Sequence, residues 1–190
     1  GASITLSGTL PENVQFSDGG FGSWTLSGLP PVGSGGEYGP DLTMTINGVS
    51  ATRKMRLIVL EKPDITSSNL AIFPVGLNTS FRVFATGFPK AQLDGIPGLQ
   101  SNAMRFTITG ALPPGLSFRD TDTTGAGIPV GAAVIHGTPQ PGTTGSYPLT
   151  ITANNGVIPA STQQFTLLVT LAGDVNNDTR IDCTDASLVR

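Results

Sequence analysis

The sequence predicts an all-β protein made of antiparallel β-sandwiches in tandem, and three observations support this prediction. Short runs alternate apolar and polar residues with the period of two that half-buried strands require, as in QQFTLLVT at residues 163–170. Gly and Pro are abundant, with 25 and 15 of the 190 residues, and they separate these runs. The same order of runs also occurs twice along the chain.

The repeat divides the chain into two modules. Three pairs of segments align: residues 3–16 with 104–118, residues 23–30 with 132–139, and residues 37–60 with 146–169. In the first pair SGTLPENVQF stands opposite TGALPPGLSF, and the differences fall in turns, where insertions are tolerated. The repeat therefore predicts one module over residues 1–60 and a second over residues 61–171.

The first module is shorter than the second. The second opens with two strand-like runs, near Leu70–Phe73 and Phe81–Ala85, which have no counterpart in residues 1–60. A sandwich without its opening strands has an open sheet edge and an uncovered core. There are two alternative explanations. The natural chain extends upstream of Gly1, or a strand from another molecule completes the module by β-strand addition.

Composition indicates an extracellular protein and excludes several classes of function. Charged residues make up only 12% of the chain, and the net charge is −3 with Lys and Arg scattered, so no basic surface for nucleic acid is expected. No apolar run reaches the roughly 20 residues of a membrane span. The single cysteine, Cys183, excludes an intramolecular disulfide framework.

Several runs of the second module together point to a known family. They are ITSSNLAIFPVG, SFRVFATGFP, GALPPGLSF, IHGTP and YPLTITANNGV. This order resembles the Ig-like repeat of bacterial surface and secreted proteins, over nearly all of residues 65–169 and over the latter part of a module in residues 3–60. The resemblance implies tandem Ig-like, cadherin-like β-sandwiches that act as spacer, adhesive or assembly modules. It implies no catalytic residues, because the family has none in common.

The C-terminal stretch GDVNNDTRIDCTDASLVR has the spacing of a calcium loop. Calcium takes about six or seven oxygen ligands, and a 12-residue loop can wrap one ion. With the first aspartate as position 1, side-chain oxygens occupy positions 1, 3, 5, 9 and 12, and position 7 offers a backbone carbonyl. The expected ligands are Asp174, Asn176, Asp178, Arg180 through its carbonyl, Asp182 and Asp185.

This stretch departs from an ordinary EF-hand at two positions. Position 6 is Thr179 in place of Gly, and position 12 is Asp185 in place of Glu. DVNNDTRIDCTDASLVR resembles the first half of a type I dockerin, and the resemblance implies a short loop and the start of a helix over residues 172–190. A dockerin uses two such halves to fold and to bind a cohesin. Only one half is present in this sequence, so a cohesin-like partner is not the expected one.

Candidate catalytic groups do not gather in the sequence. The only histidine, His136, stands opposite Ser27 in the repeat and is expected to face solvent. Trp24 stands opposite Ala133 and is expected to pack in the core or across strands. Outside the calcium loop the acids are scattered over loops, so no pair of carboxylates for hydrolysis is indicated.

Three hypotheses follow for a non-catalytic extracellular or cell-surface protein whose partners are other protein modules or further copies of itself. The first is a structural or adhesive chain with a calcium-stabilised C-terminus. The second is a subunit of a filament, in which a neighbour completes the first module by strand addition. The third is an accessory region of a larger secreted enzyme, anchored through a dockerin.

Overall fold

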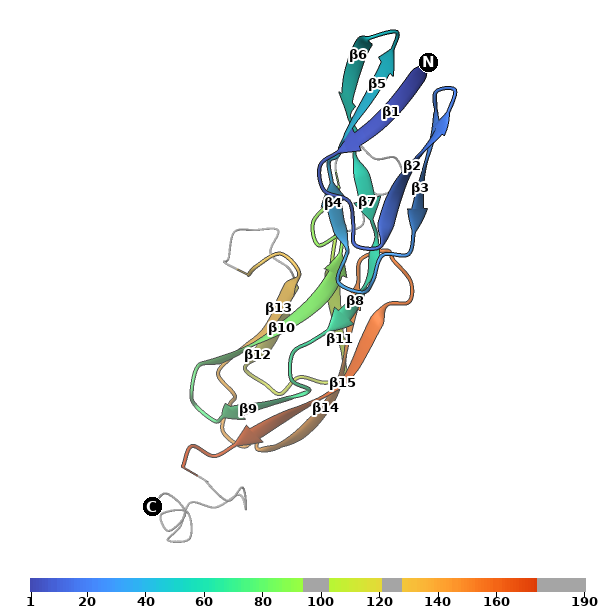
Figure 1. Cartoon of the computed structure of the whole chain (residues 1–190). Coiled ribbons are helices and arrows are strands. Elements are labelled where there is room, and N and C mark those ends of the chain that lie inside the picture. The colour runs from blue at the N-terminus through green and yellow to red at the C-terminus, as the bar shows by residue number, and fades with distance from the viewer. Residues whose placement is uncertain (94–102, 121–127, 174–190) are drawn as a thin grey trace, which may run out of the picture. The chain divides into compact units, whose positions relative to one another are not determined.

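The computed structural model describes residues 1–93, 103–120 and 128–173, and every regular element in these ranges is a β-strand. The all-β class is therefore confirmed. The chain forms two compact units (Figure 1). Unit 1 consists of Gly1–Glu61 with Gly87–Pro89, and unit 2 consists of Lys62–Thr86 with Lys90–Arg190.

Unit 2 contains two four-stranded sheets that enclose one core, as in a β-sandwich. The strand order of the first sheet is β12 (Leu116–Arg119), β13 (Ala132–Gly137), β10 (Thr79–Phe88) and β8 (Glu61–Ile65). The order of the second is β11 (Arg105–Thr109), β14 (Gly145–Asn154), β15 (Ser161–Thr170) and β9 (Leu70–Pro74). The runs near Leu70–Phe73 and Phe81–Ala85 thus form β9 and β10.

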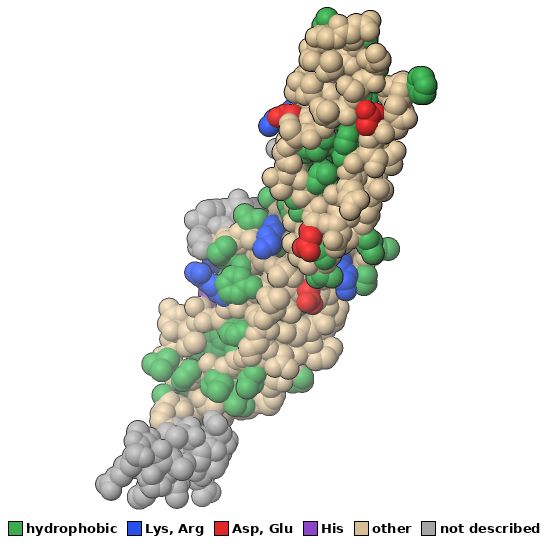
Figure 2. Space-filling view, in the orientation of Figure 1, with side chains coloured by type: hydrophobic (Ala, Val, Ile, Leu, Met, Phe, Trp, Pro, Cys, Tyr) green, Lys and Arg blue, Asp and Glu red, His purple; other side chains and the backbone are tan. Residues whose placement is uncertain are grey.

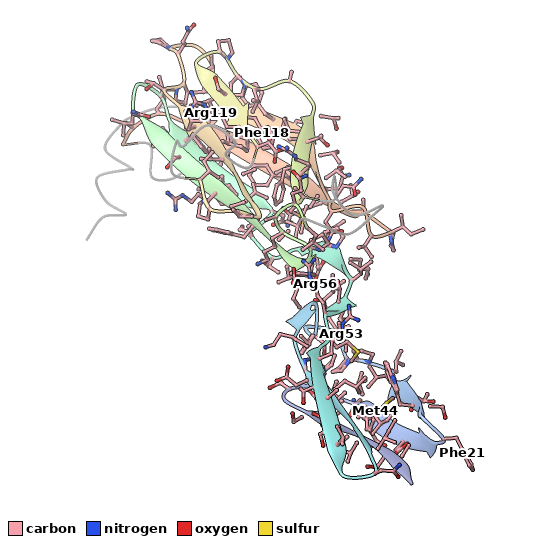
Figure 3. All side chains as sticks on the ribbon, turned by 90° about the horizontal axis from the view of Figure 1, so that it is seen from above. Phe21, Met44, Arg53, Arg56, Phe118 and Arg119 are labelled. Carbon is pink, nitrogen blue, oxygen red and sulfur yellow. The ribbon has the colours of Figure 1, made fainter. Side chains whose placement is uncertain are left out.

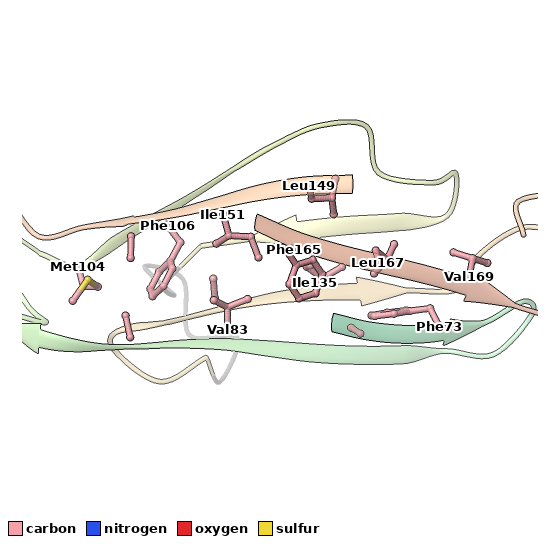
Figure 4. Close-up of a cluster of buried hydrophobic side chains, with 14 residues drawn as sticks. Phe73, Val83, Met104, Phe106, Ile135, Leu149, Ile151, Phe165, Leu167 and Val169 are labelled. Carbon is pink, nitrogen blue, oxygen red and sulfur yellow. The ribbon is translucent and has the colours of Figure 1, made fainter. Parts of the chain in front are cut away.

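Alternating residues of these strands fill the space between the two sheets (Figure 4). Phe165, Leu167 and Val169 of β15 are buried at every second position, as period-two patterning requires. The remaining buried hydrophobic residues of the core are Ala71, Phe73, Val83, Ala85, Met104, Phe106, Ala133, Ile135, Leu149, Ile151 and Ala153. Both β9 and β10 contribute, so the core is closed on both sheets.

One strand pair departs from the antiparallel arrangement that the alternation predicts. β9 runs parallel to β15, with Leu70 opposite Thr166 and Pro74 opposite Thr170. Backbone hydrogen bonds of 2.8 Å join Thr166 N–H to the Asn69 carbonyl and Val75 N–H to the Thr170 carbonyl. The period of two fixes which face of a strand is buried but carries no information on the direction of its partner.

The chain enters and leaves unit 2 at opposite ends of its longest strands. β8 lies beside the end of β10, because Thr66 N–H donates to the Phe84 carbonyl and the Thr86 hydroxyl donates to the Asp64 carbonyl. β15 ends beside the turn that leads into the start of β10, where Val75 binds Thr170. A ten-residue strand such as β10 spans about 33 Å, which separates the two points.

Unit 1 contains a three-stranded sheet and two strand pairs (Figure 1). β1 (Ala2–Ser7), β5 (Asp41–Ile46) and β6 (Val49–Lys54) form the sheet, in the order β1-β5-β6. β2 (Val14–Gly20) pairs with β3 (Ser23–Gly28), and β4 (Gly36–Tyr38) pairs with β7 (Leu57–Val59). Gly39 and Pro40 separate β4 from β5, whereas the corresponding residues of unit 2 belong to the continuous strand β14.

Equivalent contacts recur in the two units. The Asp18 carboxylate accepts a hydrogen bond from Ile4 N–H, and the Asp120 carboxylate accepts one from Phe106 N–H, each across 14 residues. The hydroxyl of Tyr38 donates to the carbonyl of the residue four positions before it, and that of Tyr147 does the same, both at 2.8 Å. The strand pairings agree, since β1–β5 sets Ile4 opposite Met44 and β11–β14 sets Phe106 opposite Ala153.

A glycine closes the same strand junction in each unit. Gly137 has φ +135° at the end of β13, and a Cβ there would overlap the carbonyl oxygen of Gly115. Gly28, at the end of β3, has φ +146°, and a Cβ there would overlap the carbonyl oxygen of Asn13. Only glycine permits both this backbone conformation and this approach of two chains.

Candidate functional site

The six expected calcium ligands and the C-terminal loop and helix start lie outside the described residues. Among the residues that the structure describes, no group of three or more His, Cys, Asp or Glu side chains could hold a metal ion. In the same part of the chain no helix is long and apolar enough to cross a membrane. The described acids instead make separate contacts.

Two of these carboxylates hold backbone N–H groups in place. Hydrogen bonds from Ile4 N–H at 3.0 Å and Gly20 N–H at 2.9 Å hold the pKa of the Asp18 carboxyl below its usual value. Asp120 accepts from Phe106 N–H at 2.7 Å and lies 3.5 Å from the Arg105 guanidinium. Asp18 lies within β2 and Asp120 directly follows β12, so each carboxylate ties its strand to a strand of another sheet, β1 and β11 respectively.

Two further carboxylates serve unit 1. Glu61 accepts hydrogen bonds from the N–H groups of Gly33 and Gly35, which fixes the loop before β4. Glu37 makes a bidentate pair with Arg56, with N–O distances of 2.8 and 2.9 Å, and this pair lowers the pKa of the Glu37 carboxyl. These four described acids thus make structural contacts. Hydrolysis of a glycosidic bond instead uses a pair of carboxylates that face each other across a cleft.

His136 lies on the outward face of β13, as expected, but it is less exposed than a solvent-facing position implies. Its side chain is half-buried, and its Nε2 is buried with no hydrogen-bond partner within the described ranges. β13 is a central strand with β10 on one side and β12 on the other, so neighbouring strands surround an outward-pointing side chain. The equivalent Ser27 is exposed because β3 has a neighbouring strand on just one side in the described part of the chain.

Trp24 packs across the β2–β3 hairpin. Its ring stacks on that of Phe16 with a centroid distance of 6.2 Å and an interplanar angle of 28°. The side chain is nevertheless 37% exposed, whereas its counterpart Ala133 is fully buried. The cross-strand packing expected for Trp24 is present, but more than a third of the residue remains exposed.

The candidate interaction surface is the outer edge of β3 together with the inner face of unit 1. In unit 2 the equivalent strand, β13, pairs with β10, and Ile135 lies opposite Phe81 while Ala133 lies opposite Val83. Among the described residues no strand takes this place beside β3 (Figure 1). The N–H and C=O groups along this edge therefore lack a strand partner in the described part of the chain.

Equivalent positions are also less buried in unit 1 than in unit 2. Leu26, Leu42 and Leu57 are half-buried, and their counterparts Ile135, Ile151 and Leu167 are fully buried. Leu57 corresponds to Leu167 by strand pairing, because they lie opposite Tyr38 and Tyr147. Ile4 is the only hydrophobic residue of unit 1 among the buried hydrophobic residues in the described ranges. The inner face of unit 1 is thus apolar by composition but only partly covered.

Further apolar side chains of unit 1 reach the surface (Figure 2). Phe21, at the tip of the β2–β3 hairpin, is fully exposed and has a left-handed φ of 54°, which is uncommon for a bulky residue. Figure 3 shows it pointing away from the hairpin, while Met44 lies on β5. No sequence pattern singled out Phe21, because glycines on both sides place it in a turn.

Comparison with known families gives the identity of the second module. The Putative Ig domain model matches residues 63–170, which is more than half of the chain. The chain belongs to the Putative Ig domain family. The Ig-like resemblance stated from the sequence is therefore confirmed for unit 2. None of the curated proteins compared with the chain matches it.

Solved structures align over most of the chain at low identity. A fragment of the titin I-band covers 90% of this chain and 56% of its own, with 13% identity and a TM-score of 0.44. Domains 4 and 5 of the S-layer protein SbsC cover 89% of this chain and 70% of their own, with 13% identity and a TM-score of 0.37. An endo-fucoidan hydrolase of glycoside hydrolase family 107 gives 21% identity and a TM-score of 0.41. The chain spans about a quarter of that hydrolase, 24% of its length.

Proposed function

We propose that the chain is a non-catalytic structural part of an extracellular or cell-surface bacterial protein, in which Ig-like units act as spacers between other domains. Membership of the Ig family supports this function. So does the use of Asp18, Asp120, Glu37 and Glu61 in structural contacts. A spacer needs units that hold their shape while the chain passes through them from one end to the other.

The observation that carries the proposal is the parallel pairing of β9 with β15. β9 is the second strand of unit 2 along the chain and β15 is the last described one, and the two run in the same direction. A force that pulls the two ends of the unit apart therefore slides β9 along β15. Their hydrogen bonds, including Thr166 N–H to Asn69 and Val75 N–H to Thr170, are then loaded together.

Single-molecule force measurements test this function. With handles at residues 62 and 171, unit 2 is expected to unfold at a force severalfold above that of ordinary hairpins, because the β9–β15 bonds break together. Handles at residues 144 and 171 provide the control, since Gly145 lies opposite Val169 and pulling there opens the β14–β15 pair one bond at a time. Equal, low unfolding forces in both geometries would contradict the spacer function.

We further propose that residues 172–190 bind calcium as one dockerin-like half. The donor set of Asp174, Asn176, Asp178, Arg180, Asp182 and Asp185 suits calcium by residue type, because it offers carboxylate, amide and carbonyl oxygens. Bound calcium would offset half of the negative charge of the four carboxylates that this short stretch contains, and so reduce their mutual repulsion. Thr179, where the loop normally has Gly, is expected to lower the affinity.

Isothermal titration with calcium is expected to give one site with a dissociation constant below millimolar. Asp185→Asn removes the closing carboxylate and should weaken binding about tenfold or more. Glu12→Gln, which removes an exposed acid far away in the sequence, is the matched control and should leave the affinity unchanged. Equal binding by the wild type and the Asp185 variant would show that the ion lies elsewhere.

A further inference from the structure

We propose that the candidate interaction surface of unit 1 is an acceptor site for an extended polypeptide segment of the same kind as β9–β10 of this chain. Such a segment would add one strand to β3 in antiparallel pairing and a second to β7 in parallel pairing. This goes beyond the spacer function, whose main supporting observation, the β9–β15 pairing, lies in unit 2.

Unit 2 supplies the template for the first added strand. There β10 pairs with β13 so that Phe81 lies opposite Ile135 and Val83 lies opposite Ala133. The repeat makes Leu26 equivalent to Ile135 and Trp24 equivalent to Ala133. An incoming strand with apolar residues at alternate positions would therefore place two of them beside Leu26 and Trp24, and would supply the hydrogen bonds missing along β3.

The second added strand follows from the other sheet. In unit 2 Ala71 and Phe73 of β9 lie opposite Leu167 and Val169 of β15, and both are buried. By strand pairing the equivalent residues of unit 1 are Leu57 and Val59 of β7, which lie opposite β4 as Leu167 and Val169 lie opposite β14, and both are half-buried. A segment with two short strands and a turn between them could thus cover both sheets of unit 1, as Leu70–Phe88 does in unit 2.

The acceptor surface selects segments by which of their alternating residues face it. β10 turns Phe81 and Val83 toward the core and Arg82 and Phe84 away from it; Phe84 is 43% exposed. Moving the segment by one residue would bring a charged side chain onto the apolar face. Recognition therefore depends on the inward positions of the segment and not on its outward ones.

Trp24 makes the test direct, because it is the only tryptophan and lies at the acceptor edge. The intact chain is titrated with a synthetic peptide of residues 70–88. The expected result is saturable binding in the micromolar range, with a shift of Trp24 emission to shorter wavelength and a severalfold loss of acrylamide quenching. Amide exchange of β3 residues 23–28 should slow at the same time.

Two control peptides test the register without altering the protein. Phe81→Ser with Val83→Ser changes the inward face and should abolish binding. Arg82→Ser with Phe84→Ser changes the outward face by the same number of residues and should bind like the parent. Equal binding of both controls would overturn the proposal, since it would indicate nonspecific association.

A covalently linked copy of the segment tests the site even if the free peptide binds weakly. A second copy of residues 70–88, joined by a flexible linker before Gly1, raises the effective concentration of the segment to millimolar or above. Trp24 should then be buried without added peptide, and the peptide should no longer bind. An unchanged Trp24 emission in both experiments would overturn the acceptor site. The force measurement on unit 2 tests the spacer function independently of this result.

Discussion

Phe165→Ala is expected to destabilise unit 2 by about 3–5 kcal/mol, the usual cost of removing a buried phenylalanine side chain. Phe165 is 2% exposed at the centre of β15, and its ring lies 5.3 Å from that of Phe81, centroid to centroid, across the sandwich. Truncation leaves a cavity between the two sheets that the paired strands cannot close. Urea unfolding followed by circular dichroism gives the change in free energy of unfolding.

Phe84→Ala is the matched control, since it removes the same side chain from the outward face of β10, where Phe84 is 43% exposed. We expect a loss of about 1 kcal/mol or less there. Trp24 emission reports unit 1 separately and should keep its midpoint in both variants. Equal losses for Phe165→Ala and Phe84→Ala would mean that burial does not determine the stability of this unit.

Gly137→Ala is expected to cost about 2–4 kcal/mol, because it combines overpacking with a backbone conformation that alanine disfavours. The new Cβ would overlap the carbonyl oxygen of Gly115 and lie 3.1 Å from the Cα of Leu116. Both neighbours are backbone atoms of β12 or of the turn before it, so no side chain can move to make room. The β12–β13 pair must separate or shift.

Gly142→Ala separates the two contributions. Gly142 has φ +82°, but a Cβ there meets no atom within 4 Å. Its substitution therefore measures the conformational term alone, about 1 kcal/mol. Thermal unfolding of the two variants under the same conditions gives the comparison. If Gly137→Ala were no worse than Gly142→Ala, the close approach of the two backbones would have no energetic weight.

Much of the fold follows from the sequence because alternation determines which side of a strand is buried. The runs near Leu70–Phe73 and Phe81–Ala85 form β9 and β10, and residues 163–170 lie within β15. The direction of β9 could not be predicted in this way, because parallel and antiparallel partners place the same residues on the core side. The separation of β4 from β5 at Gly39 and Pro40 was also missed.

The candidate surface was only partly predictable. The missing counterparts of β9 and β10 indicate an open edge, but the sequence does not show how far Trp24 and Leu26 remain exposed. His136 is less exposed than Ser27, although the two positions are equivalent in the repeat. β13 lies between two strands, whereas β3 has one neighbour among the described strands. The exposure of a side chain depends on the neighbouring strands, and these differ between equivalent positions of unit 1 and unit 2.

The carboxylates of Asp18, Asp120 and Glu61 accept hydrogen bonds from backbone N–H groups. The partner in each bond is a dipole at contact distance, and dissolved ions screen such contacts far less than they screen separated surface charges, whose attraction fades beyond about 10 Å at 0.1 M salt. Only 12% of the residues are charged. The backbone segments that these bonds hold in place are therefore suited to keep their geometry from low to high salt concentration.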